Sequence, residues 1–180
     1  MQEMTGLLAQ YGLALVFANV LLAQAGAPLP AVPLLFMYPD ATVPVTQLSL
    51  QSRLGPAYHY RLGQALSALR AQGLLIVGSG SLTHNLYEIG RHAVDAPPEP
   101  YVGEFREWTW AQLEAGYFDD LLDYRRRAPH GARAHPTEEH LLPLFVAMGA
   151  AMGAAGKTSA ERIHASGTYG FLRMDAYAFH

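Results

Sequence analysis

The sequence predicts an α/β fold, in which a mixed or parallel sheet is flanked by helices and preceded by an apolar N-terminal helix. Residues 43–50 and 74–77 have the composition of strands, and the segment between them has helical periodicity. This order favours a parallel pair of strands, because a helical crossover returns the chain in the same direction. Residues 4–39 contain no charged side chain, and the apolar run at residues 7–22 is long enough for a helix.

The elements of the first half follow from local patterns. Residues 43–50 indicate a strand, and Pro44 stands at its start, where a missing backbone donor is tolerated. Apolar side chains at three- and four-residue spacing predict a helix over residues 55–72, and Gly73 is a typical helix stop. The short apolar run at residues 74–77 then predicts a buried strand.

The second half begins with a loop rich in proline, after which helices are predicted over residues 102–115 and 118–126. Thr137 is a good N-cap residue, and the two glutamates after it suit the first turn of a helix that runs to about residue 151. Alternating side chains at residues 171–177 predict a closing strand, with residues 163–166 as its neighbour.

Composition narrows the class of protein. The chain has 180 residues, of which 51% are hydrophobic and 15% charged, so it can bury a core of its own. A net charge of −3 argues against nucleic acid as a partner, because a nucleic-acid groove needs a basic face. The absence of cysteine excludes disulfides, thiolate metal sites and cysteine nucleophiles. We therefore expect a cytoplasmic protein, with membrane association as the alternative.

Two histidine motifs are the candidates for chemistry. Residues 78–86 read Gly-Ser-Gly-Ser-Leu-Thr-His-Asn-Leu and follow the predicted strand, so His84 lies near its carboxyl end, where open α/β sheets place their chemistry. Residues 135–144 read His-Pro-Thr-Glu-Glu-His-Leu-Leu-Pro-Leu and contain His140 in the first turn of the predicted helix. Taken alone, His84 could equally be a hydrogen-bonded histidine in a turn, and His140 a helix-capping histidine at the surface.

The order of these motifs resembles that of the class III extradiol ring-cleavage dioxygenases of the DODA type, which are LigB-like. The likeness extends to Tyr-Pro-Asp-Ala and Val-Pro-Val within residues 38–45, and to residues 169–177, so that it covers residues 34–180. It implies a partial LigB-like core and an enzyme that opens a small aromatic diol of the catechol type with O2.

The resemblance also assigns the site. Extradiol cleavage uses a redox-active metal with open positions, commonly Fe(II) held by two histidines and a carboxylate. By resemblance, His140 is a metal ligand, and His84 is either the catalytic acid–base residue or a second metal ligand. Fe(II) is the expected metal and zinc the alternative, because both accept imidazole. No other cofactor-binding residue is predicted.

Full-length members of the family carry two further metal-binding histidines nearer the N-terminus, in His-Gly-Ser-Pro and Ala-His-Trp segments, and another histidine in Asp-His-Gly. This sequence has no histidine before His59. We therefore expect a family member that is truncated at the N-terminus and has weak or no turnover alone. Self-association or a completing partner chain is expected, and the alternative is an inactive remnant that serves as a metal-binding or interaction module.

The first 33 residues differ from the rest. They are apolar and end in a proline-rich run, and they resemble the start of a DedA-family membrane protein. This predicts a division into residues 1–33 and residues 34–180. An apolar helix in residues 5–24 would be a membrane anchor, a signal peptide or a soluble helix packed on the sheet, and contact with a membrane through this segment stays open.

Overall fold

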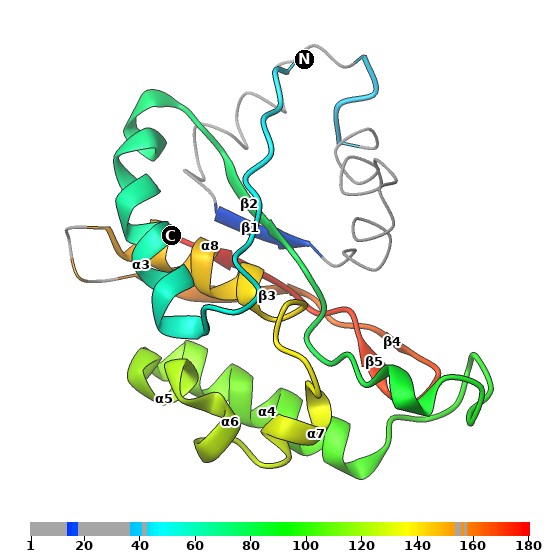
Figure 1. Ribbon diagram of the computed structural model, residues 1–180. Helices are drawn as coiled ribbons and strands as arrows, with labels where there is room; N and C mark the ends of the chain where they lie inside the picture. Colours follow the sequence, from blue (N-terminus) through cyan, green and yellow to red (C-terminus); the bar gives the residue numbers. More distant parts are fainter. Residues whose placement is uncertain (1–13, 18–36, 41–42, 154–155, 157) are drawn as a thin grey trace.

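The computed structural model describes residues 14–17, 37–40, 43–153, 156 and 158–180. Figure 1 shows strands and helices in the upper part of the molecule, and a further group of helices beneath them. The strands are β1 Ala14–Phe17, β2 Ile76–Ser79, β3 Ala160–His164, β4 Gly167–Thr168, β5 Leu172–Arg173 and β6 Ala176–Phe179. The helices are α3 Pro56–Leu66, α4 Pro100–Ala115, α5 Phe118–Leu122, α6 Tyr124–Arg127, α7 Gly131–Ala134 and α8 Leu142–Met152, with 3-10 turns η3 Ser67–Gln72 and η4 Leu86–Glu88.

The main sheet is mixed, which confirms the predicted α/β class. Its order is β2-β1-β6-β3, with β1 parallel to β2 and antiparallel to β6, and with β3 antiparallel to β6. Strands β4 and β5 form a separate hairpin. The closing strand predicted over residues 171–177 is only partly correct, because these residues are divided between β5 and the first half of β6. Its predicted neighbour at residues 163–166 overlaps β3 at residues 163–164, and β3 does pair with β6.

The predicted strand at residues 43–50 is wrong. These residues form no strand, and most of their side chains are exposed. The parallel neighbour of β2 is β1, so the sheet contains a segment that is much farther away in sequence. Local composition shows that a segment can be extended, but a strand also needs a partner, and the partner cannot be read from composition.

The predicted apolar helix over residues 7–22 is wrong where it can be compared with the structure. Only residues 14–17 of it are described, and they form β1. The remainder, like most of residues 5–24, lies outside the described residues. A short apolar run suits a buried strand as well as a helix, so its periodicity does not decide between them. Within the described residues, no helix combines the length and the apolar character that a bilayer crossing requires.

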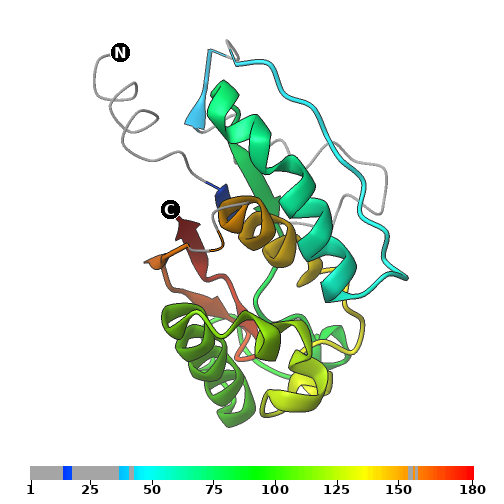
Figure 2. The ribbon, with the colours of Figure 1, turned by 90° about the vertical axis from the view of Figure 1, so that its left-hand side faces the viewer.

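Helix α8 is the centre of the upper part of the molecule. Ten of its eleven residues, Leu142 to Ala151, are buried. A helix that is apolar on all sides belongs in an interior, and α8 indeed lies between α3 and the sheet. Figure 2 shows α3 and α8 side by side. Helix α8 begins at Leu142, so the predicted helix start at Thr137 is wrong. Pro143 is accommodated in the first turn of a helix, but it would break a helix that began five residues earlier.

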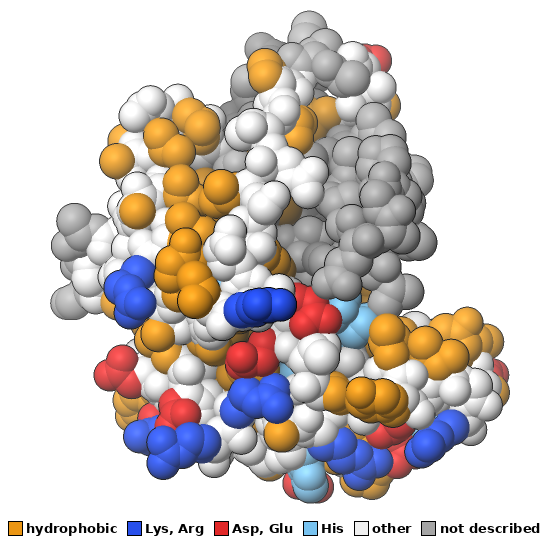
Figure 3. All heavy atoms as spheres, in the orientation of Figure 1, with side chains coloured by type: hydrophobic (Ala, Val, Ile, Leu, Met, Phe, Trp, Pro, Cys, Tyr) orange, Lys and Arg blue, Asp and Glu red, His pale blue; other side chains and the backbone are white. Residues whose placement is uncertain are grey.

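Helices α4 to α7 pack beneath the sheet around an aromatic core. Phe105, Tyr124 and Phe145 are buried there, with ring centroids 6.1 Å apart for the first two and 6.2 Å apart for the last two. In Figure 3, most of the charged side chains on the visible face lie in the lower half of the molecule, where Figure 1 places these helices. The predicted helix over residues 118–126 is present as two short helices, which are interrupted at Asp123.

The contact between α3 and α8 depends on glycine. A Cβ atom at Gly63 would lie 2.1 Å from the carbonyl oxygen of Val146, and one at Gly149 would lie 2.0 Å from that of Tyr60. Real Cβ atoms do not approach a carbonyl so closely, so the two helix backbones touch only because both positions lack a side chain.

We predict that Gly63→Ala lowers the free energy of unfolding by about 3 kcal/mol, because the added methyl group forces the helices apart. Gly103→Ala in α4 is the matched control. A Cβ atom there meets no described atom within 4 Å, and alanine is the better helix former, so stability should rise by up to about 1 kcal/mol. Urea denaturation measures both variants, and equal midpoints would contradict the helix contact.

Candidate active site

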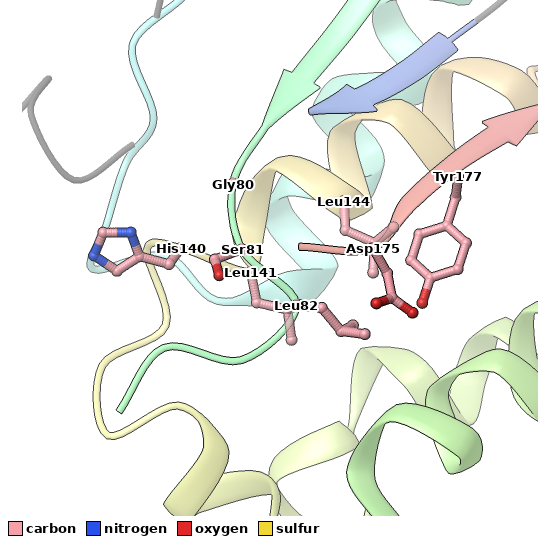
Figure 4. A pocket seen from close by; sticks show the side chains of 8 residues that line it. All are labelled: Gly80, Ser81, Leu82, His140, Leu141, Leu144, Asp175 and Tyr177. Atoms are coloured by element: carbon pink, nitrogen blue, oxygen red, sulfur yellow. The ribbon is translucent and has the colours of Figure 1, made fainter. Parts of the chain in front are cut away.

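The candidate site lies where the chain leaves β2 and runs against the residues that precede α8. A Cβ atom at Gly78 would be 2.4 Å from the carbonyl oxygen of Pro143, and one at Gly80 would be 2.3 Å from that of His140. The glycine-rich motif is therefore needed for close approach of two backbones. Figure 4 shows Gly80 and Ser81 beside the segment that leads into α8.

Backbone hydrogen bonds fix this approach. The Ser81 amide donates to the carbonyl oxygen of His140 at 2.8 Å, and the His84 amide donates to that of Ala134 at 2.9 Å. On the other side, the Thr83 hydroxyl donates to the carbonyl oxygen of Phe171 at 2.8 Å. The segment from Ser81 to His84 is thus held between the approach to α8 and the β4–β5 hairpin.

The two histidines singled out in the sequence come together. The rings of His84 and His140, which we call the histidine pair, are stacked with centroids 3.5 Å apart and planes 27° apart. Each residue is only 6% exposed. The Glu139 carboxylate lies beside the pair, with its Oε1 atom 3.4 Å from Nε2 of His140. His140 lies just before α8 and not in its first turn, so the predicted helical position was wrong.

Burial keeps the histidine pair neutral. Burial and, to a smaller extent, the like charge of a protonated His140 lower the pKa of His84 to about 4, although Glu139 opposes both effects. Burial also lowers the pKa of His140, again opposed by Glu139. Neutral imidazole is the form that binds a metal ion or accepts a proton, so both rings carry a free lone pair at neutral pH.

A third histidine, His135, was not among the candidates from the sequence. It begins the motif that contains His140, and its side chain is completely buried. Its Nε2 atom lies 2.6 Å from the carbonyl oxygen of Leu82, two residues before His84. Burial lowers its pKa to about 3, although the hydrogen bond to Leu82 opposes the shift. The feature of the sequence that could have indicated a role for His135 is its position next to Pro136, in the same short motif as His140.

The residues after His84 form a polar network that the sequence did not reveal. The Asn85 side-chain amide donates to Oε1 of Glu88 at 3.0 Å, and the Arg133 guanidinium lies 3.3 Å from the same oxygen. Glu88 is 5% exposed, so this carboxylate is buried with an amide and a cation as partners. The network fixes the chain direction just beyond the histidine pair.

A small cavity adjoins the site but is too small for an aromatic substrate. Its volume is about 10 Å³, which is room for about one water molecule. Figure 4 shows the His140 ring pointing away from Asp175 and Tyr177, which lie on the other side of the Gly80–Leu82 segment. The cavity is lined by Gly80, Ser81, Leu82, His140, Leu141, Leu144, Asp175 and Tyr177.

The fold and the two histidine motifs agree with one protein family, the LigB family. The sequence model of the family described as "Catalytic LigB subunit of aromatic ring-opening dioxygenase" matches residues 30–173. The chain belongs to this family, which confirms the resemblance to LigB-like extradiol dioxygenases. The resemblance of the N-terminal segment to DedA proteins stays a prediction.

Curated relatives carry more specific names. A protein of Beta vulgaris named "4,5-DOPA dioxygenase extradiol" is 43% identical over 149 residues, which are 82% of this chain and 53% of that protein. One of the same name from Escherichia coli K12 is 37% identical over 123 residues, 65% of this chain and 44% of that protein. The chain therefore spans about half the length of the curated relatives it matches.

A solved structure shares the fold. The crystal structure of an uncharacterized protein from Escherichia coli K12 aligns with 98% of this chain and 91% of its own, with a TM-score of 0.71 and 24% identity. At this identity the match supports the LigB-like α/β architecture and nothing finer.

We predict that the protein loses stability as the pH falls from about 6.5 towards 3. An unfolded histidine takes up its proton near pH 6.5, whereas folded His135 does so only near pH 3. The unfolded chain therefore binds more protons in this window, and each one costs about 1.4 kcal/mol per pH unit. His135→Gln keeps a donor for Leu82 and cannot titrate, so the slope of unfolding free energy against pH should decrease. An unchanged slope would contradict the neutral, buried state of His135.

Proposed function

We propose that this chain supplies the C-terminal part of an extradiol ring-cleavage dioxygenase domain, which acts on a catechol-type aromatic diol with O2. The observation that carries the proposal is the histidine pair, whose rings lie 3.5 Å apart although they come from two distant segments. Family membership and the names of the relatives support the reaction type. Residues 34–180 are the proposed dioxygenase part, and residues 1–33 the proposed separate N-terminal segment.

The residues present fit a metal ion as part of its ligand set. Bonds from a metal to imidazole nitrogen are about 2.0–2.1 Å long and lie in the plane of the ring. The two rings are stacked, so one ion binds nitrogens of both only after one ring rotates. Both rings are neutral, as ligands must be. Among the described residues, however, no group of three His, Cys, Asp or Glu side chains could hold a metal ion.

The histidine pair supplies fewer protein ligands than an Fe(II) site of this kind uses. The sequence has no histidine before His59, and His59 is buried and hydrogen-bonded to the backbone of Gly55. We therefore propose that a partner chain completes the site. The proposed metal is Fe(II), with zinc as the alternative, and a bound ferrous ion would supply redox-active coordination for the catechol oxygens and for O2.

The two histidines have different proposed roles. His140 is the proposed ligand, because Glu139 lies beside its ring and can accept the proton of one nitrogen, leaving the other for a metal. His84 is proposed to take the proton of a catechol hydroxyl, because burial keeps its ring unprotonated and leaves a lone pair to accept one. With a rotation of one ring, His84 also remains a candidate for a second ligand.

We predict that Co(II), used as a spectroscopic substitute for Fe(II), binds wild type weakly and binds His84→Ala and His140→Ala at least about tenfold more weakly. His164→Ala is the matched control, because His164 is exposed and bonded to the Ser166 hydroxyl. Its affinity should equal that of wild type. Equal affinities for all four proteins would exclude the histidine pair as a metal site.

We predict little or no catechol-dependent O2 uptake by the chain alone with added Fe(II). Addition of the N-terminal half of a full-length relative, which supplies the further histidines, should raise the uptake. Robust turnover by the isolated chain would contradict the need for a partner chain. Failure of every such half to raise it would favour the inactive remnant over the enzyme.

A further inference from the structure

His135 lies at the junction of the two segments that bring the histidine pair together. It follows α7 and precedes Pro136, which restricts it to an extended backbone. Its carbonyl oxygen accepts a hydrogen bond from the Arg125 guanidinium at 2.7 Å. Its ring is enclosed by the aromatic rings of Phe105 and Tyr124, with centroids 5.7 Å and 6.0 Å away. The backbone and the ring of His135 are therefore both held in place.

The geometry defines the proton on this ring. A carbonyl oxygen can only accept, so the Nε2 atom that lies 2.6 Å from the Leu82 oxygen must carry the hydrogen. The Nδ1 atom is buried and has no hydrogen-bond partner among the described residues. A second proton there would place an unpaired charge in an apolar core, so the ring is a fixed neutral donor.

Three hydrogen bonds connect residues 81–84 to residues 134–140. Two are between backbone groups, from Ser81 to His140 and from His84 to Ala134. The third is the bond from His135 to Leu82, and it is the one made by a side chain. This bond holds Leu82, which is two residues before His84, and its donor His135 lies in the motif that also contains His140.

We infer that His135 is a positioning residue, whose donated hydrogen bond to Leu82 sets the distance between the rings of His84 and His140. This inference rests on the proposed function, because the distance between the two rings affects catalysis only if a metal ion or a substrate binds there. Displacement of a reacting group by about 1 Å can reduce an enzyme's rate about 100-fold. No metal is needed to observe the spacing itself.

The experiment measures the ring–ring nuclear Overhauser effect between the two histidines by NMR, in metal-free protein labelled at the histidine rings. Wild type should show the effect, and so should His135→Gln, whose amide can still donate to Leu82. His135→Leu fills the same space without a donor and should lose the effect. His59→Leu is the matched control, because His59 is equally buried but bonds within the approach to α3, and it should keep the effect.

The outcomes separate the two proposals. If His135→Leu keeps the ring–ring effect, the positioning role is overturned, whatever the metal titrations show. If His135→Leu does not fold, His135→Asn provides the same comparison, because its amide is one methylene too short to reach Leu82. As a second readout, Co(II) affinity should fall about 10- to 100-fold in the variants that lack the donor and should be rescued in His135→Gln. Absent Co(II) binding in wild type, with the NMR pattern intact, would reject the metal site alone.

Discussion

The close backbone contact between the exit of β2 and the approach to α8 is the constraint on which the site depends. Gly78 and Gly80 face the carbonyl oxygens of Pro143 and His140 at distances that no side chain allows. This contact brings two sequence motifs within hydrogen-bonding reach. Because α8 is in turn held against α3 by a second glycine contact, the approach to α8 is fixed from both sides. The absence of a side chain at these glycines therefore determines how closely the elements around the site pack.

Three imidazole rings at the site are buried in the neutral form. His84, His135 and His140 are all enclosed, and burial is the largest cause of the low pKa of each ring. A buried ring that stays neutral retains a lone pair, which is a requirement for metal binding and for proton transfer. Because these buried rings resist protonation, the folded state is less stable in acid. The same physical property thus links the proposed chemistry to the pH dependence of the fold.

The sequence predicted those parts of the fold that depend on local pattern. The helix over residues 55–72 is present as α3 and the 3-10 turn η3, and it stops at Gly73 as predicted, while the closing strands are present with shifted bounds. The partner of β2 could not be predicted, because β1 is an apolar segment without a distinctive period and lies far away in the chain. In the site, His84 and His140 were found through their motifs. His135 and the Glu88 network were missed, because burial and hydrogen bonds between distant residues leave no local signature.

The position of β1 in the sheet has a consequence for biosynthesis. Its neighbours are β2, in the middle of the chain, and β6, which ends at Phe179. Pairing of such distant segments carries a large entropic cost and is slow. During translation, β1 therefore gains its second neighbour only after β6 has left the ribosome, and until then this apolar segment is prone to aggregate.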